Sequence, residues 1–423
     1  MGKGYRVSAA LVASAIAVGV LAGCGGSGGA KGSTTIKICT SLPVSGADTS
    51  AGKPAENGAN LAIKQANANK TIAGYTLVPV NLDDVGPSGT HDPTTGANNI
   101  RSAISDGLVA GCVAPFNSSV ALAEMPIANN AGLALISPSN TNPTLTKPEG
   151  GQLSTLRPTN KVTYFRVSTT DDLQGPAGAD YFYKQAGAKK VYIIDDTETY
   201  GKGIADTFSD QFKKDGGTVV GRKGLDKSTQ DFKPAITEAV TAGADSIYYG
   251  GTDGNGGTKA RVQMVSVPGA ANLIFGGGDG LQTDSFLKTT AQANASGAVV
   301  TVASVNADKL AGAAQFKTDF AKEYSDPAAY GAYSANAYDA ANIMIQSIKK
   351  ALDGGATTPK DGSDSDGAKA FRLAVVDQIA KIDYNGVTGH TTFDANGDTT
   401  NKVISIYKSG ATSWDFVTQF NVG

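Results

Sequence analysis

Two short clusters of polar side chains each follow a run of apolar residues, at the point where a buried strand would end. Residues 115–119 (PFNSS) follow the apolar run 108–114, and residues 137–143 (SPSNTNP) follow the apolar residues 133–136. Asn117 is a favoured residue type at a helix start, where free backbone N–H groups attract anions. Ligands of parallel α/β sheets bind at the carboxyl ends of strands. The clusters therefore predict a carboxylate cradle, although such residues also decorate purely structural turns.

The sequence lacks the residue sets that catalysis or metal binding would need. No His-Glu-x-x-His motif occurs, and His91 and His390 lie far apart beside turn residues, where we expect surface positions. Residues 254–257 (GNGG) are only a fragment of a dinucleotide motif and are expected to form a loop. Residues 393–398 (FDANGD) have the wrong spacing for a calcium loop and predict a hairpin turn. We predict no catalytic residue, no metal and no cofactor.

Length and charge narrow the class of protein further. The 423 residues allow two domains plus a leader, and 40% hydrophobic residues are ample for a buried core. The 36 basic and 38 acidic residues give a formal net charge of -2, so the sequence predicts no basic surface for nucleic acid. This composition is typical of a globular protein that works outside the cytoplasm.

The first residues have the order of a bacterial export signal. Two basic residues precede an apolar run, 7–22, that is too short for a comfortable transmembrane helix. The run ends in residues 21–24 (LAGC), which resemble a lipobox, where the bond before the Cys is cut and the thiol carries a diacylglycerol. We predict a signal peptide at 1–23, a lipidated Cys24, and a flexible tether at 24–34. An ordinary signal peptide or an uncleaved anchor is the alternative.

Strand-like and helix-like segments alternate from residue 35 onward, in two series. The candidate strands of the first series are 36–40, 75–82, 108–114 and 133–136. Those of the second series are 191–194, 218–220, 246–249, 273–275 and 298–302. Such alternation predicts parallel sheets and the α/β class, and two series predict two lobes. The helical region 311–351 carries an aromatic series, expected mainly to pack in the core, with one or two members reaching a pocket.

These features, in this order, resemble the leucine/isoleucine/valine-binding protein family, the type I periplasmic binding proteins of branched-chain amino acid ABC importers. The resemblance covers nearly the whole chain after the leader. It is carried by the segments 36–46 (IKICTSLPVSG), 136–146 (ISPSNTNPTLT), 174–176 (QGP), 200–203 (YGKG), 248–251 (YYGG) and 387–394 (VTGHTTFD). It implies an α/β fold of two doubly wound lobes with parallel sheets, joined by a hinge that the chain crosses three times.

The resemblance also implies how a ligand would be held. An amino-acid carboxylate would be bound by Ser118 at the helix start and by Ser139 and Thr141 at the next strand exit. The ammonium group would be bound by Asp279, which lies in a glycine-rich segment where the family usually has Glu. Tyr200 of the second lobe would close over the ligand.

Two positions depart from the leucine binder around the ligand side chain. Ala51 stands where that protein has an aromatic residue, and Thr252 stands where it has Tyr. Both changes open space and add polarity, so they do not favour leucine and leave room for a larger or more polar ligand.

Cys39 and Cys112 fall in the first and third strands of the first lobe. These strands are neighbours in sheets of this order, and a disulfide between them could persist outside the cytoplasm. Two buried thiols are the alternative, because free Cys packs as a small hydrophobe.

The implied architecture has discontinuous lobes. The first lobe would comprise 35–168 and 303–388, and the second 169–302 and 389–423, with the ligand buried between them by hinge closure. The protein would be a monomer anchored by lipid on the outer face of the cell membrane, where its closed form docks on an ABC permease. The alternative function is a sensor that reports ligand to a membrane receptor; the missing catalytic set disfavours a hydrolase.

Overall fold

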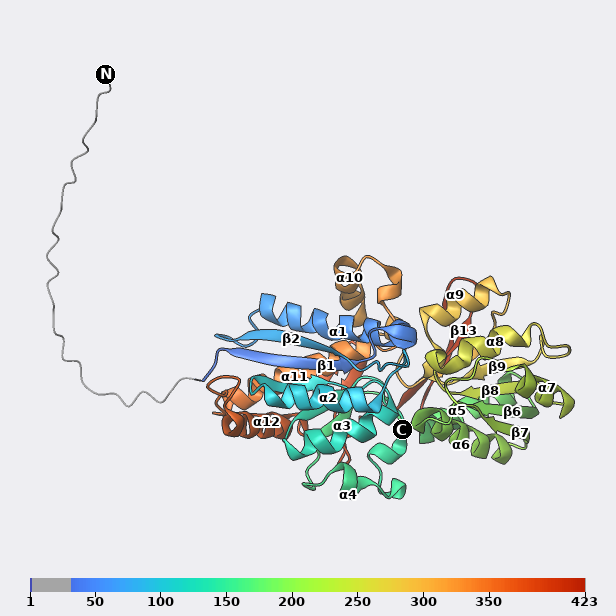
Figure 1. Cartoon of the computed structure of the whole chain (residues 1–423), viewed down its shortest axis with the longest axis horizontal. Coiled ribbons are helices and arrows are strands. Elements are labelled where there is room, and N and C mark those ends of the chain that lie inside the picture. Colours follow the sequence, from blue (N-terminus) through green and yellow to red (C-terminus); the bar gives the residue numbers. More distant parts are fainter. Residues whose placement is uncertain (2–31, 423) are drawn as a thin grey trace. The chain divides into compact units, whose positions relative to one another are not determined.

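The computed structural model describes Met1 and residues 32–422, so Cys24 and nearly all of the predicted leader lie outside the described residues. Two sheets of five and seven strands, each flanked by helices, organise this part of the chain (Figure 1). The predicted α/β class is confirmed. The first sheet is wholly parallel, and the second is parallel except at its last two strands.

The first sheet has the strand order β2-β1-β3-β4-β5. Its strands are β1 (Thr35–Leu42), β2 (Thr76–Asp83), β3 (Val109–Val113), β4 (Ala134–Ser137) and β5 (Tyr164–Arg166). Every residue of β3 and β4 is buried because helices cover both faces of the sheet. One face packs on α1 (Thr49–Ala68), α11 (Ser334–Asp353) and α12 (Ser365–Ile379). The other packs on α2 (Pro93–Ser105) and α3 (Ser118–Asn130), and the short α4 (Leu153–Leu156) follows β4 in the chain.

The second sheet has the strand order β14-β13-β10-β9-β8-β6-β7. Its strands are β6 (Lys190–Asp195), β7 (Thr218–Gly224), β8 (Ser246–Gly250), β9 (Ile274–Gly277), β10 (Val299–Val302), β13 (Val403–Ser409) and β14 (Trp414–Asn421). Its faces pack on α5 (Asp171–Asp180) and α6 (Thr199–Lys214), and on α7 (Lys233–Thr241), α8 (Thr258–Met264) and α9 (Asp284–Gln292). The remaining helix, α10 (Ala313–Glu323), packs through Phe316 and Phe320 against Leu61 of α1.

Within residues 32–422 the chain passes between the two sheets three times: after β5, after β10 and before β13. The sequence predicts the third passage at residue 389. Strand β12 (Gly389–Thr391) pairs with β11 (Tyr384–Gly386), and the ring of Phe393 packs on Phe165 of the first lobe. The carboxylate of Asp398 pairs with the fully buried Arg166 at 2.7 Å. We therefore propose that the first lobe extends to Asp398, because this carboxylate satisfies a charge buried at the end of β5.

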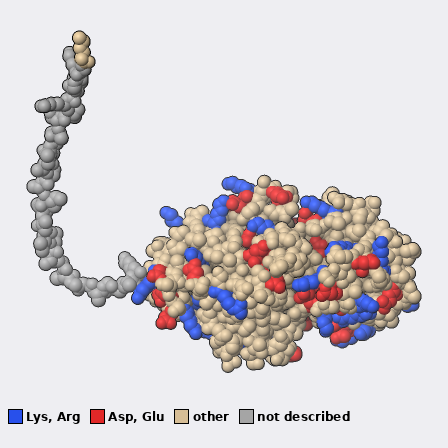
Figure 2. Space-filling view, viewed as in Figure 1, with Lys and Arg blue, Asp and Glu red and all other residues tan. Residues whose placement is uncertain are grey.

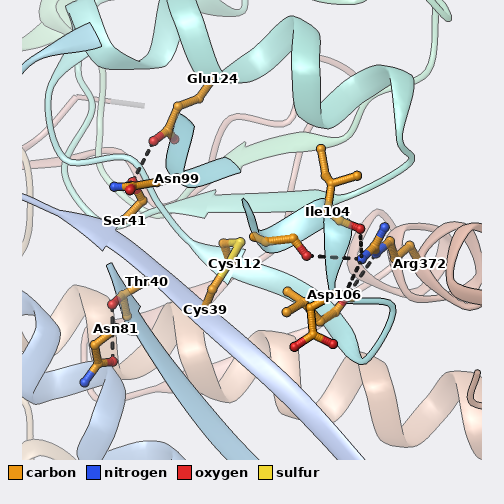
Figure 3. The surroundings of a disulfide bond; sticks show 12 residues. Cys39, Thr40, Ser41, Asn81, Asn99, Ile104, Asp106, Cys112, Glu124 and Arg372 are labelled. Carbon is orange, nitrogen blue, oxygen red and sulfur yellow. Dashed lines mark hydrogen bonds between the residues drawn. A yellow bond between two sulfur atoms is a disulfide. The ribbon is translucent and has the colours of Figure 1, made fainter. Parts of the chain in front are cut away.

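Cys39 of β1 and Cys112 of β3 face each other in register and are joined by a disulfide (Figure 3). Their Cα atoms are 4.4 Å apart, and both side chains are fully buried. The bridge ties the two central strands of the first sheet together across 73 residues of sequence.

The surface carries both signs of charge. On the face in Figure 2, acidic and basic side chains are interspersed over both lobes, and no broad basic area is visible there. Within residues 32–422, no helix combines the length and the apolar character needed to cross a bilayer.

Candidate ligand-binding site

A cavity lies between the turns of the two lobes. Its lining residues from the first lobe are Pro43, Ala47, Asp48, Ala51, Phe116, Asn117, Ala332 and Tyr333; those from the second are Thr252, Asp253, Gly254, Asp279, Gly280, Gln282 and Thr283. Its volume is about 20 Å³, close to the room of one water molecule. A ligand of amino-acid size therefore has to part the lobes or turn the facing side chains, which fits a hinged site.

The first wall of the cavity is the start of α3. Asn117 occupies the position before the first helical residue, in an extended conformation, and its side chain makes no capping hydrogen bond. Its Oδ1 has no hydrogen-bond partner, although the residue is only 7% exposed. Ser118 follows, 2% exposed, at the first position of the helix. The unpaired N–H groups of this turn make it suitable for a carboxylate.

The second polar cluster supports that wall from behind. The hydroxyl of Ser139 donates to the carbonyl of Phe116 at 2.9 Å, and the Asn140 amide donates to the same carbonyl at 2.6 Å. The hydroxyl of Thr141 donates to Oδ2 of Asp171 at 3.0 Å, which links the cluster to the start of α5. The hydroxyl hydrogens of Ser139 and Thr141 are thus committed within the protein, and what these oxygens can offer a ligand is acceptor capacity.

The opposite wall is built around Asp279, at the exit of β9. Its Oδ1 accepts hydrogen bonds from Nε2 of Gln174 at 2.7 Å and from the hydroxyl of Tyr200 at 2.9 Å. Burial raises the pKa of Asp279, an effect that these donors only partly offset. Tyr200 thus lies behind the carboxylate and orients it. Thr252, at the exit of β8, lines the cavity, and its hydroxyl accepts from the backbone N–H of Asn255 at 3.2 Å.

Asp48 lines the cavity and was not among the predicted site residues. Its Oδ2 accepts from the backbone N–H of His91 at 2.8 Å and contacts Nδ1 of the same residue at 2.9 Å. Burial alone would raise the pKa of Asp48, but His91 outweighs it, and the pKa is lowered. The prediction that His91 lies at the surface is wrong: it is 1% exposed because it supports Asp48. The other histidine, His390, is exposed and contacts Asp383 at 3.0 Å.

Asp253 and Tyr333 are two further residues of the cavity that sequence reasoning did not single out as ligand contacts. The segment 254–257, expected to be a loop, belongs to a helical turn, Asp253–Gly257. The carboxylate of Asp253 accepts a hydrogen bond from the hydroxyl of Thr283 at 2.6 Å. Tyr333 is one member of the aromatic series that reaches the cavity. An acid directly before a glycine-rich stretch at a strand exit was the signal that could have indicated Asp253.

Comparisons with known proteins give a consistent family. Residues 35–411 match the family described as periplasmic binding protein. A Leu/Ile/Val-binding protein of Rhizobium johnstonii is 29% identical over 381 residues, which cover 88% of this chain and 91% of that protein.

Solved structures share the fold over almost their whole length. A branched-chain amino acid transporter substrate binding protein of Streptococcus pneumoniae, in complex with isoleucine, has a TM-score of 0.74 at 25% identity, covering 90% of this chain and 99% of that one. A solute binding protein of R. palustris in complex with benzoate has a TM-score of 0.72 at 19% identity, covering 91% and 96%.

Proposed function

The chain belongs to the periplasmic binding protein family, whose members bind solutes outside the cytoplasm, and we propose that its ligand is an α-amino acid or a close analogue. The protein would deliver this ligand to an ABC importer after hinge closure. Its relatives that bind branched-chain amino acids support the transport role over a sensory one.

The observation that carries the proposal is the opposition of charge across one cavity. The start of α3, with the unpartnered Oδ1 of Asn117 beside it, lies in the first lobe, and the carboxylate of Asp279 lies in the second. A helix N-terminus favours an anion, and a buried carboxylate requires a cation or donors. A molecule with a carboxylate and an ammonium group on one carbon satisfies both walls, and only when the lobes are closed.

We assign the remaining predicted contacts in the same way. Ser118 and the backbone N–H groups at the start of α3 would contact the carboxylate. The oxygens of Ser139 and Thr141, whose hydroxyl hydrogens are already donated within the protein, would accept from the ammonium group. Asp279, oriented by Tyr200, would complete the ammonium side, and Thr252 would form part of the side-chain pocket. The protein would act as a monomer without catalysing a reaction, held at the outer face of the membrane by a lipid on Cys24.

An aromatic carboxylate is the competing ligand class, because a protein of the same fold binds benzoate. Such a ligand would fill the anion side but leave Asp279 without a cation. Desolvating a carboxylate without a partner is costly, so the cavity favours the zwitterion.

A thermal-shift screen of the twenty common L-amino acids and benzoate tests the proposal. A ligand at one hundred times its Kd stabilises the folded state by about 2.7 kcal/mol, so a true ligand raises Tm. The best amino acid is then compared by calorimetric titration with its decarboxylated amine and its deaminated acid. We expect each analogue to bind at least about thirtyfold more weakly. Stronger binding of benzoate, or equal binding of the deaminated acid, would refute the zwitterion site.

A further inference from the structure

The cavity is lined by more carboxylates than a single ammonium group could neutralise. Three carboxylates line it, those of Asp48, Asp253 and Asp279, and none of its lining residues is Lys, Arg or His. In a leucine or valine site the ligand side chain needs an apolar pocket, because burying a charged group against aliphatic carbon without a partner is costly.

The turns that carry two of these acids, Asp48 and Asp253, meet from opposite lobes. The helical turn Gly46–Asp48 of the first lobe abuts the turn Asp253–Gly257 of the second: a Cβ on Gly254 would lie 2.1 Å from Oδ1 of Asp48. Burial raises the pKa of Asp253, hydroxyl hydrogen bonds oppose it, and the charge of Asp48 adds a smaller rise. Lobe closure thus buries Asp253 beside the Asp48–His91 pair, where its charge is unfavourable unless a cation accompanies it.

Neighbouring basic groups pair with Asp48 but leave the negative charge of the other two carboxylates without a partner. His91 is hydrogen-bonded to Asp48, and Lys227, the other cation that acts on Asp48, is paired with Glu198 at 3.3 Å. Asp253 is held by the uncharged hydroxyls of Thr283 and Thr258. After these pairings, Asp253 and Asp279 remain without a cationic partner at the cavity, against the partial positive charge of one helix start.

A second observation points to a ligand rich in donors. Asn117, more than nine-tenths buried, lines the cavity, and no group of the described chain satisfies its Oδ1. Such an acceptor has lost its water and lacks a replacement, which a ligand N–H would supply. A zwitterion of net charge zero would satisfy Asp279 but leave Asp253 unpaired.

We propose that the preferred ligand is a basic α-amino acid, whose side-chain amine or guanidine is held between Asp253 of the second lobe and Asp48 of the first. This inference rests on the proposed amino-acid site and names the substrate class of that site. The distal cation would give the buried Asp253 carboxylate the partner it lacks in the closed form and so couple recognition of the side chain to closure.

Pairs of ligands that differ only in the distal amine test this directly on the unchanged protein. L-ornithine is compared with L-norvaline, and L-lysine with L-norleucine, by calorimetric titration. We expect at least one amine-bearing ligand to bind tenfold or more tightly than its partner. Equal or tighter binding of norvaline and norleucine would overturn the inference while upholding the amino-acid site. Failure of every amino acid to bind would overturn both.

A conservative variant tests whether Asp253 is the residue that recognises the distal amine. Asp253→Asn keeps an acceptor for the Thr283 hydroxyl but removes the charge, so the affinity for ornithine should fall about tenfold or more relative to the affinity for norvaline. Asp210→Asn, at an exposed position of α6, is the matched control and should change neither. An equal loss for both ligands in Asp253→Asn would contradict the assignment, because it would indicate a general disturbance of the site.

Discussion

The side-chain amide of Asn142 donates a hydrogen bond of 2.6 Å to the backbone carbonyl of Thr199, joining a loop of the first lobe to the start of α6 in the second. The next residue, Tyr200, donates to Asp279 at the cavity. The hydrogen bond between the lobes therefore lies one residue from the side chain that holds the Asp279 carboxylate. At the proposed site, this turn of α6 would couple lobe closure to ligand contact.

Asn142→Asp should weaken ligand binding by roughly three- to tenfold, because the variant loses the amide donor of that bond. The Oδ1 atom, which accepts from the backbone N–H and hydroxyl of Thr144, has a counterpart in Asp, so the local turn should persist. Calorimetric titration with the screened ligand measures the effect, and Asn98→Asp at an exposed site is the control. Unchanged affinity would mean that the bond does not contribute to the closed state.

Asp279→Ala should reduce affinity by at least about thirtyfold for an amino-acid ligand. Truncating one partner of a buried charge pair typically costs about 2–5 kcal/mol, and each 1.4 kcal/mol is tenfold in Kd. Tyr200→Phe should have a smaller effect, since it removes one of the donors that hold the carboxylate. A loss of Tm with intact affinity would instead assign Asp279 a structural role.

Asp84→Asn should stabilise the protein, and more at pH 7 than at pH 5. Burial raises the pKa of Asp84 to about 8, and neither carboxyl oxygen has a hydrogen-bond partner. Between its unfolded pKa near 4 and about 8, the unfolded chain releases a proton that the folded chain keeps, so this group lowers stability as pH rises, by up to about 1.4 kcal/mol per unit.

The groups that act on Asp84 are His91, Asp48, Asp83 and Asp92, and all of them remain in the variant. Glu124, which accepts from the Ser41 hydroxyl at 2.8 Å, also remains (Figure 3). After burial, Asp84 also contributes to the raised pKa of Glu124, so a comparison of Tm against pH for variant and parent measures Asp84 together with its effect on that group. Parallel pH profiles would show that Asp84 does not titrate as expected.

Replacing both Cys39 and Cys112 with Ser should cost about 4 kcal/mol of stability in the chain-entropy description, given the 73-residue separation. Thiol titration of denatured, unreduced mature protein should detect no free thiol from these positions, and reduction should release two. Two reactive thiols before reduction would contradict the bridge in the exported protein.

Cys24→Ser should abolish acylation and cleavage before residue 24. Mass spectrometry of membrane fractions should find a diacylated mature species beginning at Cys24 only in the parent protein. The same lipidated species from the Ser variant would refute the predicted anchor.

The strands with continuous apolar runs were the most predictable part of the fold. Candidate strands 108–114 and 298–302 correspond to β3 and β10 because helices cover both faces of each sheet, which favours apolar side chains on both faces of these strands. Strand β5 was not predicted: it has three residues and ends in Arg166, whose burial depends on Asp398, distant in sequence. The turn 393–398 was predicted correctly, since Gly397 N–H bonds to the carbonyl of Asp394 at 3.0 Å.

The polar clusters at the strand exits were identified from the local sequence pattern, but the role of each residue within them was not. Asn117 was expected as a cap, yet its side chain makes no capping hydrogen bond, and the residue lines the cavity. The acids Asp48 and Asp253 become neighbours only when the lobes meet, and no local periodicity encodes such a contact. The burial of His91 likewise follows from its pairing with Asp48, 43 residues away in sequence.

The contact between α1 and α11 constrains the order in which the protein can be completed. Gly58 of α1 lies so close to the carbonyl of Ser334 that a Cβ would be 2.1 Å from it, and the Ser334 hydroxyl bonds to the carbonyl of Pro54, 280 residues earlier. The chain is made from the N-terminus onward. The apolar face of α1 therefore cannot pack against α11 until every strand from β6 to β10 has been made. Such long-range contacts slow folding and leave apolar surface exposed to aggregation. In an exported chain of this design, the apolar face of α1 therefore has to stay without its partner helix, or be shielded by another protein, until nearly all of the chain has crossed the membrane.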